Sequence, residues 1–108
     1  MQEYSKIAEV NEIPPGGRKP VVVDDLPALL IRVGDDYFCI EDTCTHDGQA
    51  MTDGPIADHE ITCPRHGARF DIRSGAPLCM PATEPVTVFA LEVRNDGIYA
   101  GPNEPEPG

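Results

Sequence analysis

The stretch CPRHGARFD, residues 63–71, sets a cysteine and a histidine three positions apart, Cys63 and His66. An earlier stretch, CTHDG, carries a second pair, Cys44 and His46, which are two positions apart. The earlier stretch is too polar to form a hydrophobic core, so Cys44 and His46 are expected on a loop. Two thiolates and two imidazoles that recur in this way indicate a metal centre.

The four candidate ligands form a Cys2His2 set, with 16 residues between the two pairs. Such a set suits either zinc or an iron–sulfur cluster in which half of the ligands are histidine. The one-residue gap in the first pair and the lack of a neighbouring helical pattern weaken a structural zinc site. Spacing alone leaves both alternatives open.

Short strands separated by turns are the structure that the rest of the chain indicates. The chain holds 10 Gly and 12 Pro and shows no convincing 3.6-residue apolar repeat, so helices are not expected. KPVVVDD and PALLIRVGDDYFCIED are rich in β-branched and aromatic residues, and residues 34–36 turn the second stretch into a hairpin. VTVFALEVRNDGIYAG, with alternation from Val86 onward, predicts another hairpin that turns through residues 95–97.

Two shorter strand candidates, HEITC and RFDIRSG, flank PRHG, so the second Cys–His pair is expected between strands. The fold class predicted from these patterns is all-β, a sandwich or barrel. At 108 residues, the chain is expected to form one domain over residues 1–101. The tail at residues 102–108, rich in Pro, Gly and Glu, is expected to be poorly ordered.

Charge and hydropathy limit the classes of partner. The formal net charge is -11, from 19 acidic and 8 basic residues, which argues against nucleic acid or an anionic membrane and favours a basic patch on another protein. No apolar run approaches the roughly 18 residues that span a bilayer, and the N-terminus lacks a signal-peptide pattern. We therefore expect a soluble cytoplasmic protein whose cysteines bind metal or are buried thiols.

With their flanks, CTHDG and CPRHGARFD resemble the two cluster-binding loops of Rieske proteins, and residues 4–101 are similar to a soluble Rieske-type ferredoxin. The resemblance implies one [2Fe–2S] cluster per chain, with Cys44 and Cys63 on one iron and His46 and His66 on the other. It also implies an antiparallel β-sandwich or barrel with a cluster-binding subdomain near residues 42–80. That subdomain also contains a third, proline-containing loop, GAPLCMPATEP, residues 75–85, which covers the cluster in this family.

The same resemblance implies a one-electron carrier, expected as a monomer, between a flavin-dependent ferredoxin reductase and a terminal ring-hydroxylating oxygenase. No nucleophile with a base, nucleotide loop or carboxylate pair stands out, so the chain is not expected to be an enzyme and no catalytic residue is assigned. One alternative is a Rieske-type small subunit of a nitrite or other reductase. An alternative of another class is a zinc-stabilised binding module.

The residues around the ligands predict a low reduction potential. High-potential Rieske proteins carry a loop-bridging disulfide, and the matching positions here are Gln49 and Arg65. The same proteins have a serine and a tyrosine that donate hydrogen bonds to cluster or ligand sulfur, where this chain has Ala68 and Phe70. Without donors that stabilise the extra negative charge, the potential is expected toward the low end of roughly -150 to +300 mV.

Other chemically suggestive residues have more ordinary interpretations. Cys39, in an apolar strand, is expected to be a buried thiol. Cys79 lies in the third loop and is expected near the cluster but not as a ligand. His59 is expected to be a solvent-facing turn or strand residue. Gly48 and Gly67 follow the ligand runs, where glycine allows a positive φ or a close approach of the backbone to the sulfides.

Overall fold

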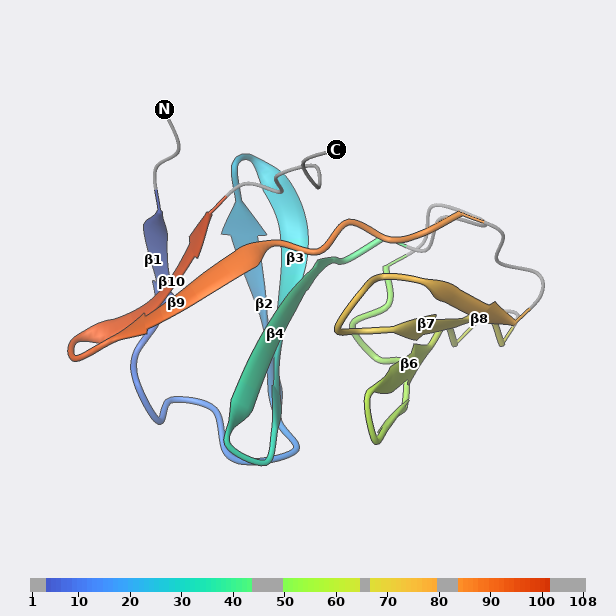
Figure 1. The fold of residues 1–108 in the computed structure, drawn as a ribbon, viewed down its shortest axis with the longest axis horizontal. Coiled ribbons are helices and arrows are strands. Elements are labelled where there is room, and N and C mark those ends of the chain that lie inside the picture. The colour runs from blue at the N-terminus through green and yellow to red at the C-terminus, as the bar shows by residue number, and fades with distance from the viewer. Residues whose placement is uncertain (1–3, 44–49, 65–66, 80–83, 102–108) are drawn as a thin grey trace.

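The computed structural model describes residues 4–43, 50–64, 67–79 and 84–101, which form three antiparallel sheets (Figure 1). The first sheet has the order β1-β10-β9, the second β2-β3-β4 and the third β5-β6-β7-β8. The strands are β1 (Ser5–Ala8), β2 (Arg18–Val23), β3 (Leu26–Val33), β4 (Asp36–Glu41), β5 (Ile56–Ala57), β6 (Glu60–Thr62), β7 (Arg69–Asp71), β8 (Pro77–Cys79), β9 (Ala90–Arg94) and β10 (Gly97–Gly101). These residues include no helix, and the predicted all-β class is confirmed.

The central strand of the middle sheet, β3, is buried on both faces. Successive side chains of a strand point to opposite faces, so the apolar run in β3 supplies two cores. Leu30 packs in an outer core with Cys39 and Phe89, between the first two sheets. Leu29 and Ile31 pack instead in an inner core that includes residues of the third sheet. An uninterrupted apolar run, rather than an alternating one, is what such a two-sided position requires.

The segment before β9 joins the first sheet to the second. The Phe89 N–H donates to the Cys39 carbonyl oxygen (2.9 Å), and the Glu41 N–H donates to the Thr87 carbonyl oxygen (2.8 Å). In Figure 1 this orange segment runs beside the end of β4. The expectation of one strand from Val86 onward is therefore wrong, because residues 87–89 bond to β4 and the pairing with β10 starts only at Ala90.

The predicted hairpin turns are confirmed. The β3–β4 hairpin closes on the pair Val33 and Asp36, with Gly34 at a φ of 61°. The β9–β10 hairpin closes on Arg94 and Gly97. Turn chemistry is local, so these positions follow from short stretches of sequence.

The β2–β3 hairpin has an aspartate at both central positions of its turn. Its two-residue loop holds Asp24 and Asp25 at φ values of 52° and 66°, as a type I′ turn requires. Glycine adopts such angles freely, whereas a residue with a Cβ atom is strained there.

We expect Asp25→Gly to raise the free energy of unfolding by ~0.5 kcal/mol and Asp25→Ala to lower it by ~1 kcal/mol. Both changes remove the same carboxylate, so their difference isolates the backbone angle from the charge. Urea unfolding of the two variants, followed by circular dichroism, measures this difference. Equal midpoints for the two variants would contradict the assigned turn.

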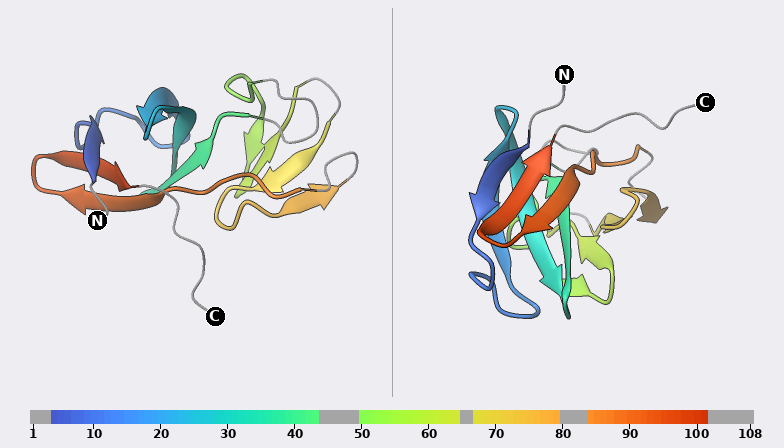
Figure 2. Two further views of the ribbon diagram at one scale, coloured as in Figure 1. Left: turned by 90° about the horizontal axis from the view of Figure 1, so that it is seen from above. Right: turned by 60° about the vertical axis from the view of Figure 1, so that its left-hand side comes forward.

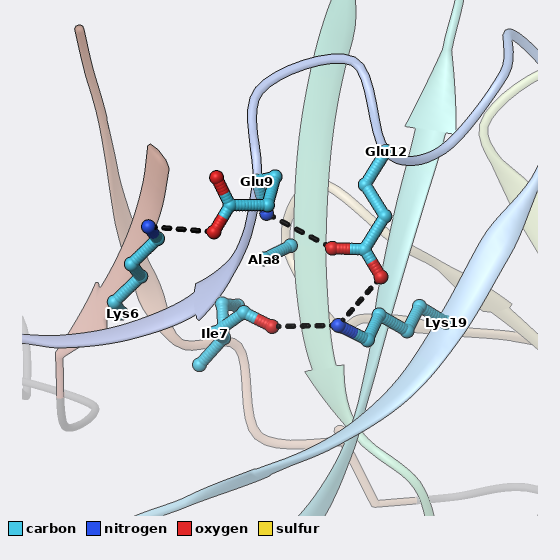
Figure 3. A pocket seen from close by; sticks show the side chains of 6 residues that line it. All are labelled: Lys6, Ile7, Ala8, Glu9, Glu12 and Lys19. Atoms are coloured by element: carbon cyan, nitrogen blue, oxygen red, sulfur yellow. Dashed lines mark hydrogen bonds and ion pairs between the residues drawn. The ribbon is translucent and has the colours of Figure 1, made fainter. Parts of the chain in front are cut away.

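An open hollow between β1 and β2 is occupied by paired charges (Figure 3). Lys6 lies 2.6 Å from Glu9, and Lys19 lies 2.8 Å from Glu12. Lys19 also donates to the Ile7 carbonyl oxygen at 3.2 Å. These hydrogen bonds raise the pKa of Lys6 and lower the pKa of Glu12. The charges satisfy one another and tie β1 to β2, so we assign no ligand to this hollow.

The third sheet stands at one end of the molecule, beside the other two sheets (Figure 2). Its β6–β7 hairpin carries the second Cys–His stretch, as the sequence predicts. The inner core includes Ile61 and Phe70 from this sheet and Ile72 just after β7, and it fixes the third sheet to the middle sheet. Among the described residues no helix has the length and hydrophobicity needed to cross a bilayer.

Candidate metal centre

Cys63 begins the loop of the β6–β7 hairpin. Its N–H donates to the Ala68 carbonyl oxygen (2.7 Å), and its own carbonyl oxygen accepts from the Gly67 N–H (3.1 Å). These two bonds close the loop, and Gly67 has the positive φ expected of it, 78°. The Cys63 side chain is 1% exposed and lies in the inner core. The backbone of Cys63 is thus fully used in the loop, and its free thiol is the group left for a ligand.

The other three predicted ligands, Cys44, His46 and His66, lie outside the described residues, as do Gly48, Gln49 and Arg65. Within the described ranges no group of three or more metal-ligating side chains occurs. Of the four-residue set, only the surroundings of Cys63 can therefore be described.

The third loop is tied at its base. The Val86 N–H donates to the Gly75 carbonyl oxygen (2.8 Å), so the two ends of the predicted loop meet. Gly75 has a φ of 80°, and a Cβ atom there would lie 2.1 Å from the Val86 carbonyl oxygen. The first part of the loop forms β8, which pairs with β7. The sequence did not predict this strand, which is only three residues long.

Cys79 connects the third loop to the β6–β7 hairpin. Its thiol donates to the Gly67 carbonyl oxygen (3.5 Å) and accepts from Arg69 Nε (3.4 Å). The Arg69 hydrogen bond lowers the pKa of this thiol. Cys79 therefore contacts Gly67, the residue that follows the predicted ligand His66 in the sequence, and its expected position near the cluster stays a prediction.

Cys39 is the buried thiol that the sequence predicts, whereas His59 is only partly exposed to solvent. Cys39 is fully buried in the outer core, and burial raises its pKa to about 12, so it stays a neutral thiol. His59 is in the β5–β6 turn, with its Nδ1 atom 3.0 Å from an Asp58 carboxylate oxygen. Its ring packs edge-on against Phe38, so it is more covered than the sequence suggests.

Asp42 is a residue of this region that the sequence analysis did not single out. It directly follows β4, its side chain is 7% exposed, and it is the one buried charged residue in the described part of the chain. Its Oδ1 atom accepts from the Met51 N–H (2.7 Å), and Oδ2 accepts from the Thr52 hydroxyl. Its position between an apolar strand and a polar loop is the feature of the sequence that could have indicated a structural role for this carboxylate.

The chemistry of this region fits an iron–sulfur cluster. A thiol that is buried but free supplies the soft ligand that iron and zinc prefer, and its apolar surroundings exclude water. The described geometry defines a class, namely a small all-β protein with a buried free thiol at the hairpin loop of a separate end sheet.

Comparison with known families identifies the family. Residues 3–90 match the model of the Rieske [2Fe-2S] domain, and the chain belongs to this family. The cofactor of the family is a Rieske-type [2Fe–2S] cluster, as the sequence predicts, and this excludes the zinc-stabilised binding module.

Relatives of similar length are named as ferredoxins. The chain is 34% identical over 99 residues to ferredoxin CarAc of Metapseudomonas resinovorans, covering 91% of this chain and 92% of that one. It is 37% identical over 87 residues to the anthranilate 1,2-dioxygenase ferredoxin subunit of Burkholderia cepacia, covering 81% and 78%. These names confirm the predicted resemblance to a Rieske-type ferredoxin, an electron-transfer component rather than a catalyst.

A solved structure agrees with this assignment. A chain in the complex of reduced oxygenase and oxidised ferredoxin of carbazole 1,9a-dioxygenase superposes with a TM-score of 0.88 at 32% identity. The match covers 95% of this chain and 97% of that chain.

Proposed function

We propose that this protein carries single electrons from a flavin-dependent ferredoxin reductase to a terminal ring-hydroxylating oxygenase. The proposed ligands are Cys44, His46, Cys63 and His66, with one cysteine and one histidine from each loop. The observation that carries the proposal is the buried free thiol of Cys63 at the start of the β6–β7 loop of a Rieske domain. When bound, the cluster supplies the chemistry, a reversible one-electron reduction.

The chain's own residues would hold this site and exclude water from part of it. Cys63 approaches it from the inner core, and the hydrogen bonds of Cys79 link the third loop to the ligand hairpin. The adjacent Pro64 and Gly67 are exposed, which leaves this loop open to a partner. A partner that docks on this loop would bring its own redox centre close to the cluster, which shortens the distance over which the electron must travel.

The net charge of -11 favours a basic partner surface and a contact that weakens with salt. We further propose a cytoplasmic monomer, in which residues 1–101 form one domain and residues 102–108 are a dispensable tail. That tail lies outside the described residues. The alternative is that the chain is a Rieske-type small subunit of a nitrite or other reductase. Reconstitution with candidate partners distinguishes the two functions.

Reconstitution tests the proposal in two stages. Iron and sulfide analysis with visible absorption first establishes the cluster in the purified protein. The holoprotein is then added to candidate reductases and oxygenases, with NADH consumption and product formation measured together. Product formation that depends on this chain supports the proposal, whereas reduction of nitrite but of no aromatic substrate would support the alternative.

The midpoint potential is expected to lie below zero, within the range of roughly -150 to +300 mV found for Rieske centres. Ala68 and Phe70 are fully buried and supply no hydroxyl donor. We expect Phe70→Tyr to raise the potential by about 40 mV, because one hydrogen bond of about 1 kcal/mol to the reduced site corresponds to that shift. A redox titration of both proteins measures this, and a wild-type value well above zero would contradict the expectation.

A further inference from the structure

Residues 51–54, here called the stem, follow the first ligand loop in the chain and pack beside the strand that leads into the second, β6. Met51 is fully buried in the inner core, and the Gly54 N–H donates to its carbonyl oxygen (2.8 Å). Gly54 packs directly on β6, since a Cβ atom there would lie 2.1 Å from the Thr62 carbonyl oxygen. Thr62 immediately precedes Cys63. A displacement of the stem would therefore move both loops.

Asp42 holds the stem from one side. Its carboxylate accepts from the Met51 N–H (2.7 Å) and from the Thr52 hydroxyl, so it joins the two ends of the first ligand loop. Its own N–H donates to the Pro27 carbonyl oxygen (2.9 Å), which fixes Asp42 to β3. Burial of a carboxylate is unfavourable unless its hydrogen bonds are satisfied, and here both oxygens are used.

Arg18 holds the stem from the middle sheet. Its Nη1 atom donates to the Thr52 carbonyl oxygen (2.9 Å) and to the Gly54 carbonyl oxygen. The side chain is half-buried and comes from β2, more than 30 residues away in sequence. Two oppositely charged side chains of the framework thus hold the same four residues through charge-assisted hydrogen bonds, which are stronger than neutral ones.

We propose that Asp42 and Arg18 are positioning residues that set the two ligand loops relative to each other and so retain the cluster. The inference rests on the proposed ligand set, because it assumes that both loops bind one cluster. Neither side chain needs to touch iron or sulfide. Their effect passes through the stem to Cys63 on one side and to the first loop on the other.

The test compares cluster retention in Asp42→Ala and Arg18→Met with the wild type. Each holoprotein is incubated with an iron chelator, and bleaching of the visible spectrum is followed at a temperature where circular dichroism shows a folded chain. We expect bleaching roughly 10- to 100-fold faster in both variants, as for other residues that orient metal ligands. The EPR spectrum of the reduced protein, which reports ligand orientation, is also expected to change.

Matched variants separate positioning from charge and from general stability. Asp36→Ala and Arg94→Met remove the same charges from exposed sites outside the stem and are expected to bleach at the wild-type rate. Asp42→Asn keeps an oxygen for the Met51 N–H, and its amide can donate to the Thr52 hydroxyl oxygen, so it is expected to restore both retention and the EPR spectrum. If Asp42→Ala does not fold, Thr52→Val removes only the hydroxyl partner and is expected to accelerate bleaching.

The outcomes distinguish this inference from the proposed function. A wild-type protein without a [2Fe–2S] spectrum would refute the ligand set itself. A wild-type protein with the cluster, and Ala, Met and Val variants that bleach at its rate with an unchanged EPR spectrum, would overturn only the role of the stem. Equal acceleration in the exposed-site controls would also overturn it, since net charge would then explain the effect.

Discussion

Replacing Cys63 by alanine is expected to abolish the visible spectrum of the purified protein and to reduce its iron from about two atoms per chain to near zero. Cys63 is 1% exposed and lies at the start of the ligand hairpin, so water has little access to the position that its thiol occupies. The second proposed cysteine and the two histidines would supply only three of the four ligands that the cluster needs. Iron analysis and absorption spectroscopy on protein produced in parallel with the wild type measure the loss.

Cys39→Ala provides the matched control. It deletes the same sulfur atom from a side chain that is equally buried, but in the outer core and not the inner one. We expect this variant to keep its iron and to lose only about 1 kcal/mol of stability, through the small cavity that remains. Retained cluster in Cys63→Ala, or lost cluster in a folded Cys39→Ala, would contradict the assignment of these two cysteines.

Replacing Gly75 by alanine is expected to lower the free energy of unfolding by about 3 kcal/mol or more. The new Cβ atom would lie 2.1 Å from the Val86 carbonyl oxygen, which already belongs to the closed base of the third loop. Overlap with backbone cannot be relieved by rotating a side chain, so the loop base must open. The φ of 80° adds the ordinary strain of a side chain in the left-handed region.

Gly34→Ala isolates the steric part of this effect. Gly34 also has a positive φ, 61°, but a Cβ atom there would meet nothing within 4 Å. We expect it to cost about 1 kcal/mol, from strain alone. Urea unfolding of both variants measures the difference, which should be about 2 kcal/mol or more. Similar losses of unfolding free energy in the two variants would show that the base of the third loop can move to accommodate the new Cβ atom.

The parts of the fold that the sequence predicts are those with local causes. The turns at residues 34–36 and 95–97 follow from Gly, Asn and Asp between apolar strands, and the structure has hairpins there. The flanks of PRHG form β6 and β7 as expected. Strands β5 and β8 are only two and three residues long, and so short a stretch shows no period that could predict it.

The candidate site divides in the same way. The ligand types and their spacing are visible in the sequence, and so is the burial expected for Cys39. The contacts of Arg18 with the stem are not, because they join residues 34 and 36 positions apart, and no local pattern encodes such a pairing. The start of β9 at Ala90, rather than Val86, likewise depends on a neighbour, since β4 takes the hydrogen bonds of the preceding segment.

The sequence by itself determined the all-β class, the principal hairpins and a Cys–His chemistry of the Rieske kind, because turn residues and ligand types act through their own side chains and immediate neighbours. Only the tertiary structure decided that the apolar run of β3 serves two cores and that Cys39 and Cys63, alike in burial, belong to different ones. It also brought Asp42 and Arg18, which are far apart in the sequence, into contact with the same stem. These facts depend on which distant segments pack together, and the free energy of that packing comes from the whole chain.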